Sequence, residues 1–427
     1  MAGASPVTVD KSKDVTDFSE ILKYRADFPV LKMQMNGKPL AYLDSASSAQ
    51  KPHAIMEAMQ EIGKMGYSNI HRGLYKISQD ITAAFEGVRP KIAALISAKT
   101  EREIIFTRNA TEGINLVAQS WGRANLKAGD EIILSAMEHH ANIVPWQLLQ
   151  QEIDFQIRVI PVLESGELDL AAYKALLSEK TKFLGIVQMS NALGTINPVK
   201  DMIRTAKTYN PNIKVLVDGA QSIVHLDIDV VDIDCDFFAF TGHKYYGPSG
   251  TGVLYGKYEV LAEMPPYQGG GDMIERVSFD GTSFKEPPFR FEAGTPAIVP
   301  IYGLGAVVDY MSSFDLAQIQ SYEGALLHYA MKKLQEIEGV TIHGAAKDRA
   351  CIVPFTLEGA QPADVATILD QCGVAVRTGH HCCMPLMDAL GLTERGGTIR
   401  ASLAFYNNYA DIDQLVSGVQ KARELLL

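Results

Sequence analysis

The sequence has no apolar run long enough to cross a lipid bilayer, which needs about 18 consecutive apolar residues. Its first residues, Met1 to Asp14, are polar and lack the apolar centre of a secretory signal. They are also acidic rather than Arg-rich, which disfavours an organellar transit peptide. We therefore expect no membrane association.

Cysteine and positive charge are both in short supply. Five cysteines in 427 residues are too few, and odd in number, for a disulfide scaffold. This scarcity favours a reducing, cytoplasmic location in which an exposed thiol stays reactive. The 39 Lys and Arg against 50 Asp and Glu give a formal net charge of −11. Nucleic acid and anionic membrane are therefore excluded as main partners, although a local basic pocket for a small anion is not.

What the sequence does contain, from about residue 104, is short apolar runs that alternate with amphipathic stretches. Continuous apolar strands separated by helices predict an α/β fold whose largely parallel sheet is covered by helices on both faces. The expected strands are Ile104–Phe106, Glu131–Ser135, Ile157–Pro161, Phe183–Met189, Lys214–Val217 and Asp236–Phe240. The expected helices between them include Thr111–Gln119, Leu168–Leu177 and Val199–Thr208.

After about residue 300 the pattern changes to long helices with a few short strands. The length alone favours two domains. We expect an N-terminal segment, residues 1–32, that packs on a smaller α+β C-terminal domain, residues 306–427. Residues 33–305 form the large domain. The predicted elements of the C-terminal part are the helices Ile301–Phe314 and Ile319–Ile337, the strands Cys351–Leu357 and Val374–Arg377, and a final helix through Ile412 and Val419.

Four polar groups follow the predicted strands, where parallel sheets bind their ligands. Lys244 follows a buried strand, and partial desolvation there makes a lysine amine nucleophilic. Asp218 ends another strand and is suited to pair with a pyridinium nitrogen. The turn into the helix at Thr111 is suited to an anion, and His139 can stack on an aromatic ring. Taken singly, each of the four residues also has a simpler interpretation without a ligand. The lysine would then be an ordinary surface residue, the aspartate would cap a turn, the threonine would cap a helix and the histidine would be structural.

Together these residues stand in the order found in fold-type I pyridoxal-phosphate (PLP) enzymes, and they resemble the class V aminotransferase and cysteine desulfurase group. The resemblance implies that Lys244 carries PLP as a Schiff base, that Asp218 pairs with its ring nitrogen and that His139 stacks on the ring. It further implies that Gln221 contacts the phenolate oxygen of the ring. Asn191 is implied to lie beside the ring and the substrate carboxylate. The implied phosphate cradle consists of Ala110, Thr111, Thr241 and His243.

The segment Arg377-Thr-Gly-His-His-Cys382 narrows the resemblance to group II, or SufS-type, cysteine desulfurases. A thiolate is the reactive form of cysteine, and neighbouring Arg or His cations favour it. A buried structural thiol and a zinc site are the alternatives. Contiguous His380, His381, Cys382 and Cys383 are poorly spaced for one tetrahedral metal, so no metal is expected.

Cys383 departs from this family, whose members usually have Ala at that position. The second thiol leaves open which cysteine receives sulfur, and a disulfide or sulfur transfer between the two is also possible. Successive side chains of an extended loop point in opposite directions. We therefore expect only one thiol to face the cofactor, and the motif favours Cys382.

Arg400 is the expected clamp for the substrate carboxylate because a guanidinium binds a carboxylate bidentately, and Arg377 is a second candidate. The resemblance implies that L-cysteine is converted to L-alanine while Cys382 becomes a persulfide. Lys244 would move the α-proton, and His139 would assist. The sulfur would then pass to an acceptor protein of SufE or SufU type for iron–sulfur cluster assembly.

The glycine-rich stretch Pro265–Met273 lacks the Lys and Ser/Thr of a nucleotide-binding loop. In SufS-like enzymes the corresponding segment is a hairpin that reaches the neighbouring subunit. Thr295, His71 and Arg72 also resemble residues near the partner's site. These resemblances imply a homodimer with shared active sites.

Three other functions remain open from the sequence. A selenocysteine lyase or cysteine sulfinate desulfinase would share the cofactor residues, so L-selenocysteine is a possible substrate. A kynureninase- or epimerase-like enzyme would not need Cys382. A non-catalytic sulfur carrier would need neither Lys244 nor Asp218.

Overall fold

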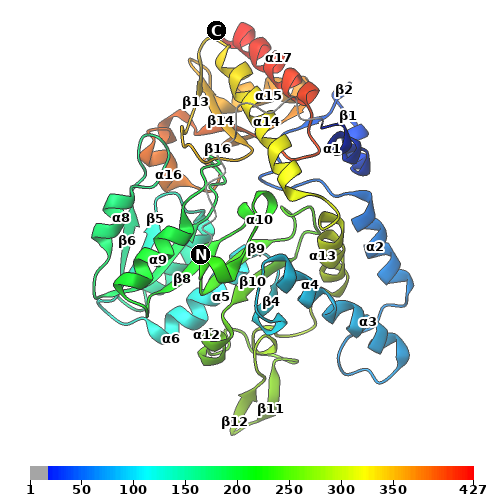
Figure 1. The fold of residues 1–427 in the computed structure, drawn as a ribbon, viewed down its shortest axis with the longest axis vertical. Helices are drawn as coiled ribbons and strands as arrows, with labels where there is room; N and C mark the ends of the chain where they lie inside the picture. The colour runs from blue at the N-terminus through cyan, green and yellow to red at the C-terminus, as the bar shows by residue number, and fades with distance from the viewer. Residues whose placement is uncertain (1–17) are drawn as a thin grey trace, which may run out of the picture.

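The computed structural model describes residues 18–427 (Figure 1). The prediction about Met1–Asp14, and most of the predicted N-terminal segment 1–32, lies outside these residues. Within residues 18–427, no helix has both the length and the apolar character needed to span a membrane.

A seven-stranded sheet forms the centre of the molecule, in the order β4-β10-β9-β8-β7-β5-β6. The six strands predicted for this sheet are present, with ends shifted by at most two residues. β10 was not predicted; it runs antiparallel to β4 and β9, whereas the other four pairings are parallel. The strands are β4 (Ile104–Thr107), β5 (Glu131–Ser135), β6 (Gln156–Ile160), β7 (Thr181–Val187), β8 (Lys214–Asp218), β9 (Phe237–Thr241) and β10 (Gly252–Gly256). The strand predicted at Val374–Arg377 is instead two short strands, β15 (Val374–Ala375) and β16 (Arg377–Gly379), in different sheets.

Helices cover both faces of this sheet, as predicted. Alternate residues of a strand point to opposite faces of the sheet, so each strand contributes side chains to two separate apolar cores, one on each face. One core contains Phe238 of β9 with residues of α4 (Val88–Leu95), α9 (Val199–Tyr209) and α13 (Ile298–Met311). The other contains Phe237 with residues of α5 (Ala110–Val117), α7 (Val144–Gln150) and α12 (Tyr258–Glu263). The fold is therefore a helix–sheet–helix sandwich.

The C-terminal part has its own antiparallel sheet, in the order β13-β14-β17-β16, which lies with α14, α15 and α17 at the top of Figure 1. These strands are β13 (Val340–Ile342), β14 (Ile352–Leu357), β16 (Arg377–Gly379) and β17 (Thr398–Ser402). The helices are α14 (Leu316–Gln335), α15 (Pro362–Gln371) and α17 (Tyr409–Leu426). All residues of β17 are buried, and this packing holds in place the strand that carries Arg400.

The start of the described chain packs on this C-terminal part. Arg25 donates hydrogen bonds to the Asp411 carboxylate at 2.7 Å and to the Tyr406 carbonyl at 2.8 Å. The ring of Phe28 lies 5.6 Å from that of Phe405. These contacts join the two ends of the chain, and the exact domain limits stay a prediction.

The other helices and strands connect these layers. The hairpin β11–β12 projects away from the rest of the molecule (Figure 1). It begins at Ile274, directly after the stretch Pro265–Met273 for which the resemblance implied a hairpin, and that stretch itself contains no strand. The remaining helices are α1 (Ser19–Lys23), α2 (His53–Lys64), α3 (Lys76–Glu86), α6 (Arg123–Asn125), α8 (Leu170–Leu176), α10 (Ser222–His225), α11 (Val230–Ile233) and α16 (Met384–Ala389). The remaining strands are β1 (Gln34–Met35), β2 (Lys38–Pro39), β3 (Ala41–Tyr42), β11 (Ile274–Ser278), β12 (Gly281–Phe284) and β15 (Val374–Ala375).

Candidate active site

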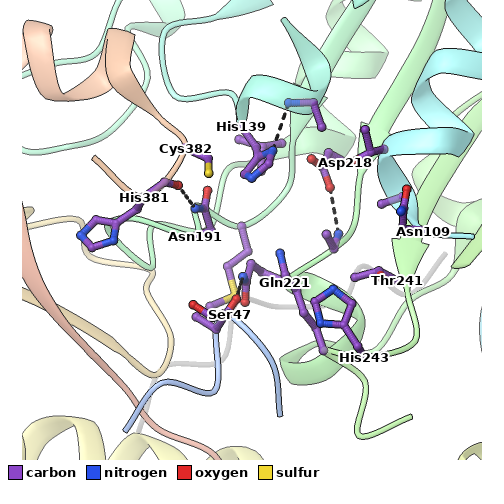
Figure 2. Close-up of a pocket in the computed structure, with 18 of the residues that line it drawn as sticks. Ser47, Asn109, His139, Asn191, Asp218, Gln221, Thr241, His243, His381 and Cys382 are labelled. Atoms are coloured by element: carbon purple, nitrogen blue, oxygen red, sulfur yellow. Dashed lines mark hydrogen bonds between the residues drawn. The ribbon is translucent and has the colours of Figure 1, made fainter. Parts of the chain in front are cut away.

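A cavity of about 410 Å³ lies at the carboxyl-end edge of the large sheet, where the C-terminal part meets it. The segments that follow five of the predicted strands, residues 107–111, 136–142, 190–195, 218–221 and 241–244, each contribute to its wall, because the ends of parallel strands meet at one edge. Figure 2 shows Cys382 and Asn191 on one side of it and Asn109 and Thr241 on the opposite side. The predicted residues that line it are Ala110, Thr111, His139, Asn191, Asp218, Gln221, Thr241, His243, Lys244, Arg377, Cys382 and Arg400.

Lys244 and Asp218 meet inside this cavity from two neighbouring strands. Lys244 lies in the turn after β9, and burial lowers the pKa of its ammonium, an effect that Asp218 opposes. Burial likewise raises the pKa of Asp218, against the N–H of Ala220 and the charge of Lys244. Ala220 donates to Asp218 Oδ1 at 2.9 Å, which leaves Oδ2 as an acceptor. An amine with a lowered pKa is a better nucleophile at neutral pH.

The protonation state of His139 follows from its hydrogen bond. Nδ1 accepts the Ala141 N–H at 3.0 Å, so a neutral ring carries its proton on Nε2. Burial, with the nearby Lys244 charge, lowers the pKa of His139 to about 4. The ring is therefore neutral at physiological pH, with a single N–H to offer in the cavity.

The end of the cavity near Thr241 is built for an anion. Ala110 and Thr111 open α5, whose first N–H groups have no acceptors within the helix. The helix can start this close to β10 because Gly252 lacks a side chain: a Cβ there would lie 2.5 Å from the Asn109 backbone. His243 borders the same end, and burial lowers its pKa to about 4, so it is neutral.

The Cys382 loop has an unusual backbone. His381 and Cys382 adopt φ values of 52° and 57°, the left-handed region that costs a non-glycine residue energy. Three contacts hold the loop: His140 N–H donates to the Cys382 carbonyl at 2.8 Å, Met384 N–H to His140 Nε2 at 3.0 Å, and Asn191 Nδ2 to the His381 carbonyl at 2.6 Å. The loop is therefore left-handed rather than extended, which corrects the conformation assumed from the sequence.

The two adjacent thiols nevertheless point to different places, as expected. Cys382 is exposed and lines the cavity, whereas Cys383 is fully buried. Cys383 donates its S–H to Asn191 Oδ1 at 3.0 Å, and burial raises its pKa to about 12. It is therefore a protonated thiol at neutral pH.

The histidine flanking Cys382 plays a different part from the one expected. His381 borders the cavity, but its ring points away from it (Figure 2), and its Nε2 lies 2.9 Å from Thr398 Oγ1. Burial, reinforced by the charges of Arg400 and Arg377, lowers its pKa to about 3. A neutral ring adds no positive charge beside Cys382, which corrects the expectation that this imidazole helps the thiolate. Arg377 and Lys244 are cations that interact electrostatically with Cys382.

Arg400 and Arg377 reach the cavity from the adjacent strands β17 and β16. Arg400 is buried and donates to the Asn191 carbonyl at 2.8 Å, to Ser47 Oγ at 2.6 Å and to Asp44 at 3.1 Å. Its Nε is buried without a hydrogen-bond partner in the described part of the chain. An unpaired buried donor is costly unless a ligand accepts from it. Arg377 is half-exposed and binds Asp44 at 3.0 Å.

His71, Arg72 and Thr295 do not line this cavity. His71 bonds to Glu86 at 2.9 Å, and Arg72 and Thr295 are exposed. The expectation that they serve a partner's site stays a prediction. Gln221 does line the cavity, and its Nε2 donates to the Ala46 carbonyl at 2.7 Å.

Comparison with known proteins gives the family. Residues 41–415 match the family model described as Aminotransferase class-V. The chain belongs to the aminotransferase class-V family. It is similar to a cysteine desulfurase of Yersinia pestis (strain Pestoides F), with 49% identity over 407 residues, 95% of this chain and 99% of the relative.

Two solved structures resemble this class-V chain closely. The cysteine desulfurase CsdA (S-sulfonic acid) from Escherichia coli superposes with a TM-score of 0.88 and is 38% identical, covering 95% of this chain and 99% of that one. The apo cysteine desulfurase from Thermococcus onnurineus NA1 also has a TM-score of 0.88, at 35% identity over 95% of this chain and 97% of that one. The predicted fold class is confirmed.

The cofactor of this family is pyridoxal phosphate, and the groups in the cavity fit it. The first turn of α5 and Thr241 suit a phosphate, while the free oxygen of Asp218 suits a ring nitrogen. Lys244 offers an amine that suits the aldehyde carbon of this cofactor. The phosphate would lie at the Thr241 end of the cavity and Cys382 lies at the other end. The cavity of about 410 Å³ between them has room for the ring and a small amino acid.

Sequence reasoning missed three supporting residues of this class-V site. Asp44 and Ser47 hold Arg400, and His140 holds the Cys382 loop. The signal for His140 was its place after β5, beside His139. Asp44 and Ser47 precede the large sheet by some 60 residues in sequence, so only the tertiary fold brings them to the site.

Glu138 is a fourth residue that the sequence did not single out. It is fully buried, and it accepts from Ser135 Oγ at 2.5 Å, Asn142 Nδ2 at 2.8 Å and Val187 N–H at 2.9 Å. Burial outweighs these hydrogen bonds and raises its pKa to about 8. The side chain that packs under the His139 turn is therefore an uncharged acid at neutral pH.

Glu138 gives a testable pH dependence of stability. Because the folded-state pKa is raised, its contribution is full below pH 4.5 and is lost as the pH rises through about 8. We expect the free energy of unfolding to fall by roughly 2–3 kcal/mol between pH 6 and 8 from this group. Glu138→Gln should flatten that decline in thermal melts, whereas Glu61→Gln on exposed α2 should not. A decline that is equally steep in Glu138→Gln would contradict this account.

Proposed function

We propose that the protein is a cysteine desulfurase that releases L-alanine from L-cysteine and holds the sulfur as a persulfide on Cys382. The observation that carries the proposal is the meeting of Lys244, Asp218 and an exposed thiol in one cavity whose far end suits a phosphate. The similarity to cysteine desulfurases over 95% of the chain supports it.

When bound, PLP supplies an electron sink that stabilises negative charge on the substrate α-carbon. The chain's own residues divide the remaining work. Lys244 holds the cofactor and carries the α-proton, and Asp218 keeps a proton on the ring nitrogen. His139 offers the proton on Nε2. Cys382, the thiol open to the cavity, attacks the substrate sulfur, so that a sulfur–sulfur bond forms as the carbon–sulfur bond breaks.

Arg400 binds the substrate carboxylate in this proposal. Its unpaired Nε and its fixed position between Asn191, Ser47 and Asp44 make it a rigid donor. Arg400→Lys keeps the charge but loses the planar pair of donors, so the KM for L-cysteine should rise about tenfold with a smaller change in kcat. Steady-state kinetics of alanine release test this. Arg204→Lys, on the exposed surface of α9, is the matched control and should leave both constants unchanged.

The finer features of the function also belong to the proposal. We propose a SufS-type enzyme of the cytoplasm that acts as a homodimer, with Thr295, His71 and Arg72 near the partner's site. Apolar side chains exposed on the α2–α3 connection and the β11–β12 hairpin support such an interface. They include Met65, Tyr67, Leu74, Val277 and Phe279. A SufE- or SufU-type acceptor would take the sulfur for iron–sulfur cluster assembly, and L-selenocysteine would be an alternative substrate.

The test is to mix the PLP-loaded protein with L-cysteine and measure alanine and sulfide in the presence of a thiol reductant. Equal amounts of the two products are expected. No alanine from a fully PLP-loaded protein would rule the proposal out. Analytical ultracentrifugation tests the dimer separately.

A further inference from the structure

The Cys382 loop runs directly into α16, and the first N–H of this helix needs an acceptor from outside the helix. The second residue of the helix, Pro385, has no N–H, and the next two N–H groups donate to the Cys383 carbonyl at 3.1 Å and 3.2 Å. The Cys383 side chain does not cap the helix. The N–H of Met384 is therefore the donor of this first turn that remains to be satisfied.

His140 supplies the missing acceptor from the turn between β5 and α7. Its ring Nε2 accepts the Met384 N–H at 3.0 Å, and its own backbone N–H donates to the Cys382 carbonyl at 2.8 Å. One residue thus binds the chain on both sides of Cys383. His140 does not line the cavity, so it acts on the site through the loop and not through the substrate.

The turn that carries His140 is firmly anchored in the large sheet layer. Asn142, two residues further on, is fully buried and accepts from Trp146 Nε1 at 3.1 Å. The same side chain donates to the buried Glu138 carboxyl at 2.8 Å. His140 is therefore a fixed point against which a loop can be positioned.

The Cys382 loop depends on such outside contacts for its shape. Cys382 is exposed, so burial does not fix its thiol, and both His381 and Cys382 adopt the left-handed backbone that costs energy. Of the three contacts that hold the loop, two come from His140 and the third from Asn191. The position of the thiol in the cavity therefore depends largely on His140.

The contact between His140 and Met384 requires an unprotonated Nε2. A neutral ring whose Nε2 accepts carries its proton on Nδ1, whereas a doubly protonated ring has only donors. Burial, with the charge of the facing His380, lowers the pKa of His140 below the ordinary value of 6.5. The ring is therefore neutral at pH 7.5, and the contact is lost only in acid. His139, whose ring also lies close, has a pKa of about 4 and stays neutral above pH 5.

We infer that His140 is a positioning residue for sulfur transfer, whose neutral ring caps α16 and so directs the Cys382 thiol towards the substrate sulfur, and whose protonation breaks this contact. The inference rests on the proposed function. When the ring takes up a proton from solvent, the Met384 N–H loses its acceptor and no covalent bond changes. The dependent step is the attack by Cys382, because capture of L-cysteine at the Lys244 end of the cavity does not use this thiol.

The experiment compares three variants of the PLP-loaded protein at pH 7.5. His140→Ala removes the acceptor, and His140→Gln keeps an uncharged acceptor of similar reach. His328→Ala, on the exposed face of α14, is the matched control. In a single turnover of L-cysteine without reductant, mass spectrometry follows persulfide formation on Cys382. Its rate should fall at least about tenfold in His140→Ala, stay within about threefold in His140→Gln and be unchanged in the control.

Two further readouts separate positioning from general damage to the site. L-Cysteine changes the absorption of bound PLP before the thiol attacks, so the rate of this change should stay within about twofold in His140→Ala. Hydrogen exchange of the peptide 382–387 should become faster in His140→Ala but not in His140→Gln. The inference is overturned by an unchanged persulfide rate in His140→Ala, by an absorption change that slows equally, or by a Gln variant as slow as the Ala variant.

The dependence on pH gives a test that needs no truncated side chain. His140→Gln cannot gain a charge, so between pH 7.5 and 5.0 the wild type should lose persulfide formation at least about twofold more than this variant. Groups that titrate elsewhere in the site, His380 included, act on both proteins alike and cancel in the ratio. If His140→Ala fails to fold, this comparison decides alone, and equal losses overturn the inference. A wild type that forms neither persulfide nor alanine would instead contradict the proposed function.

Discussion

Replacement of Lys244 by alanine is expected to reduce alanine release from L-cysteine by roughly 10³-fold or more. The reason is that one amine, set between a buried carboxylate and the carboxyl end of β9, both holds the cofactor and moves the α-proton in the proposed function. The variant should also lose the visible absorption that PLP acquires when a lysine holds it. Absorption spectra and alanine assays of the reconstituted protein measure the two effects.

Lys51 provides a matched control for this prediction. It is a second partly buried lysine near the site, where burial lowers its pKa to about 8, and its Nζ binds the Ala49 carbonyl at 2.6 Å. If a lowered pKa were sufficient, Lys51 would therefore also be a candidate for holding the cofactor. Borohydride reduction followed by peptide mapping should find the cofactor on Lys244 and none on Lys51. A cofactor attached to Lys51, or full activity in Lys244→Ala, would contradict the assignment.

The second large effect concerns the two adjacent thiols. Cys382→Ser should abolish persulfide formation and lower sulfide release by about 10³-fold, because the hydroxyl is a far weaker nucleophile than a thiolate. Cys383→Ser should keep the rate within about threefold, because Cys383 is a buried donor to Asn191 and the serine hydroxyl can donate in its place. The Cys382→Ser protein should still bind PLP.

Mass spectrometry separates the two thiols directly. After one turnover without reductant, the peptide that contains both cysteines should gain one sulfur atom in the wild type and in Cys383→Ser, but not in Cys382→Ser. A sulfur atom gained by Cys382→Ser but not by Cys383→Ser would show that Cys383 is the nucleophile. A sulfur atom that appears in both single variants would mean that either thiol can attack the substrate sulfur.

Much of the fold was predictable because the strands of a buried parallel sheet have a recognisable apolar sequence pattern. Strands covered on both faces are continuous apolar runs, and all six strands predicted for the large sheet were found. The missed strand, β10, starts and ends with glycine and follows the Lys244 turn after only a few residues. Its antiparallel pairing with β4 depends on contacts with a segment some 150 residues earlier, which a local pattern does not encode.

The site was predictable where a residue directly follows a strand. Lys244, Asp218 and His139 were predicted in this way, since strand ends of one sheet meet at one edge, whereas Asn191 was predicted from the family resemblance. The orientation of side chains was not predictable. The sequence placed His381 beside Cys382 as a helper, but the left-handed backbone turns its ring towards Thr398, where it is buried and neutral.

Lys244 and Cys382 were identified from the sequence alone, because strand-end chemistry and an uninterrupted motif are local features. The motif already favoured Cys382 over Cys383, and the tertiary structure added the physical reason, because Cys382 is exposed and Cys383 is buried. It also brought Asp44 to Arg400 and Arg377, across more than 330 residues of chain. The charge of a pocket is the sum over groups that meet in space, and their proximity is set by the packing of the whole fold.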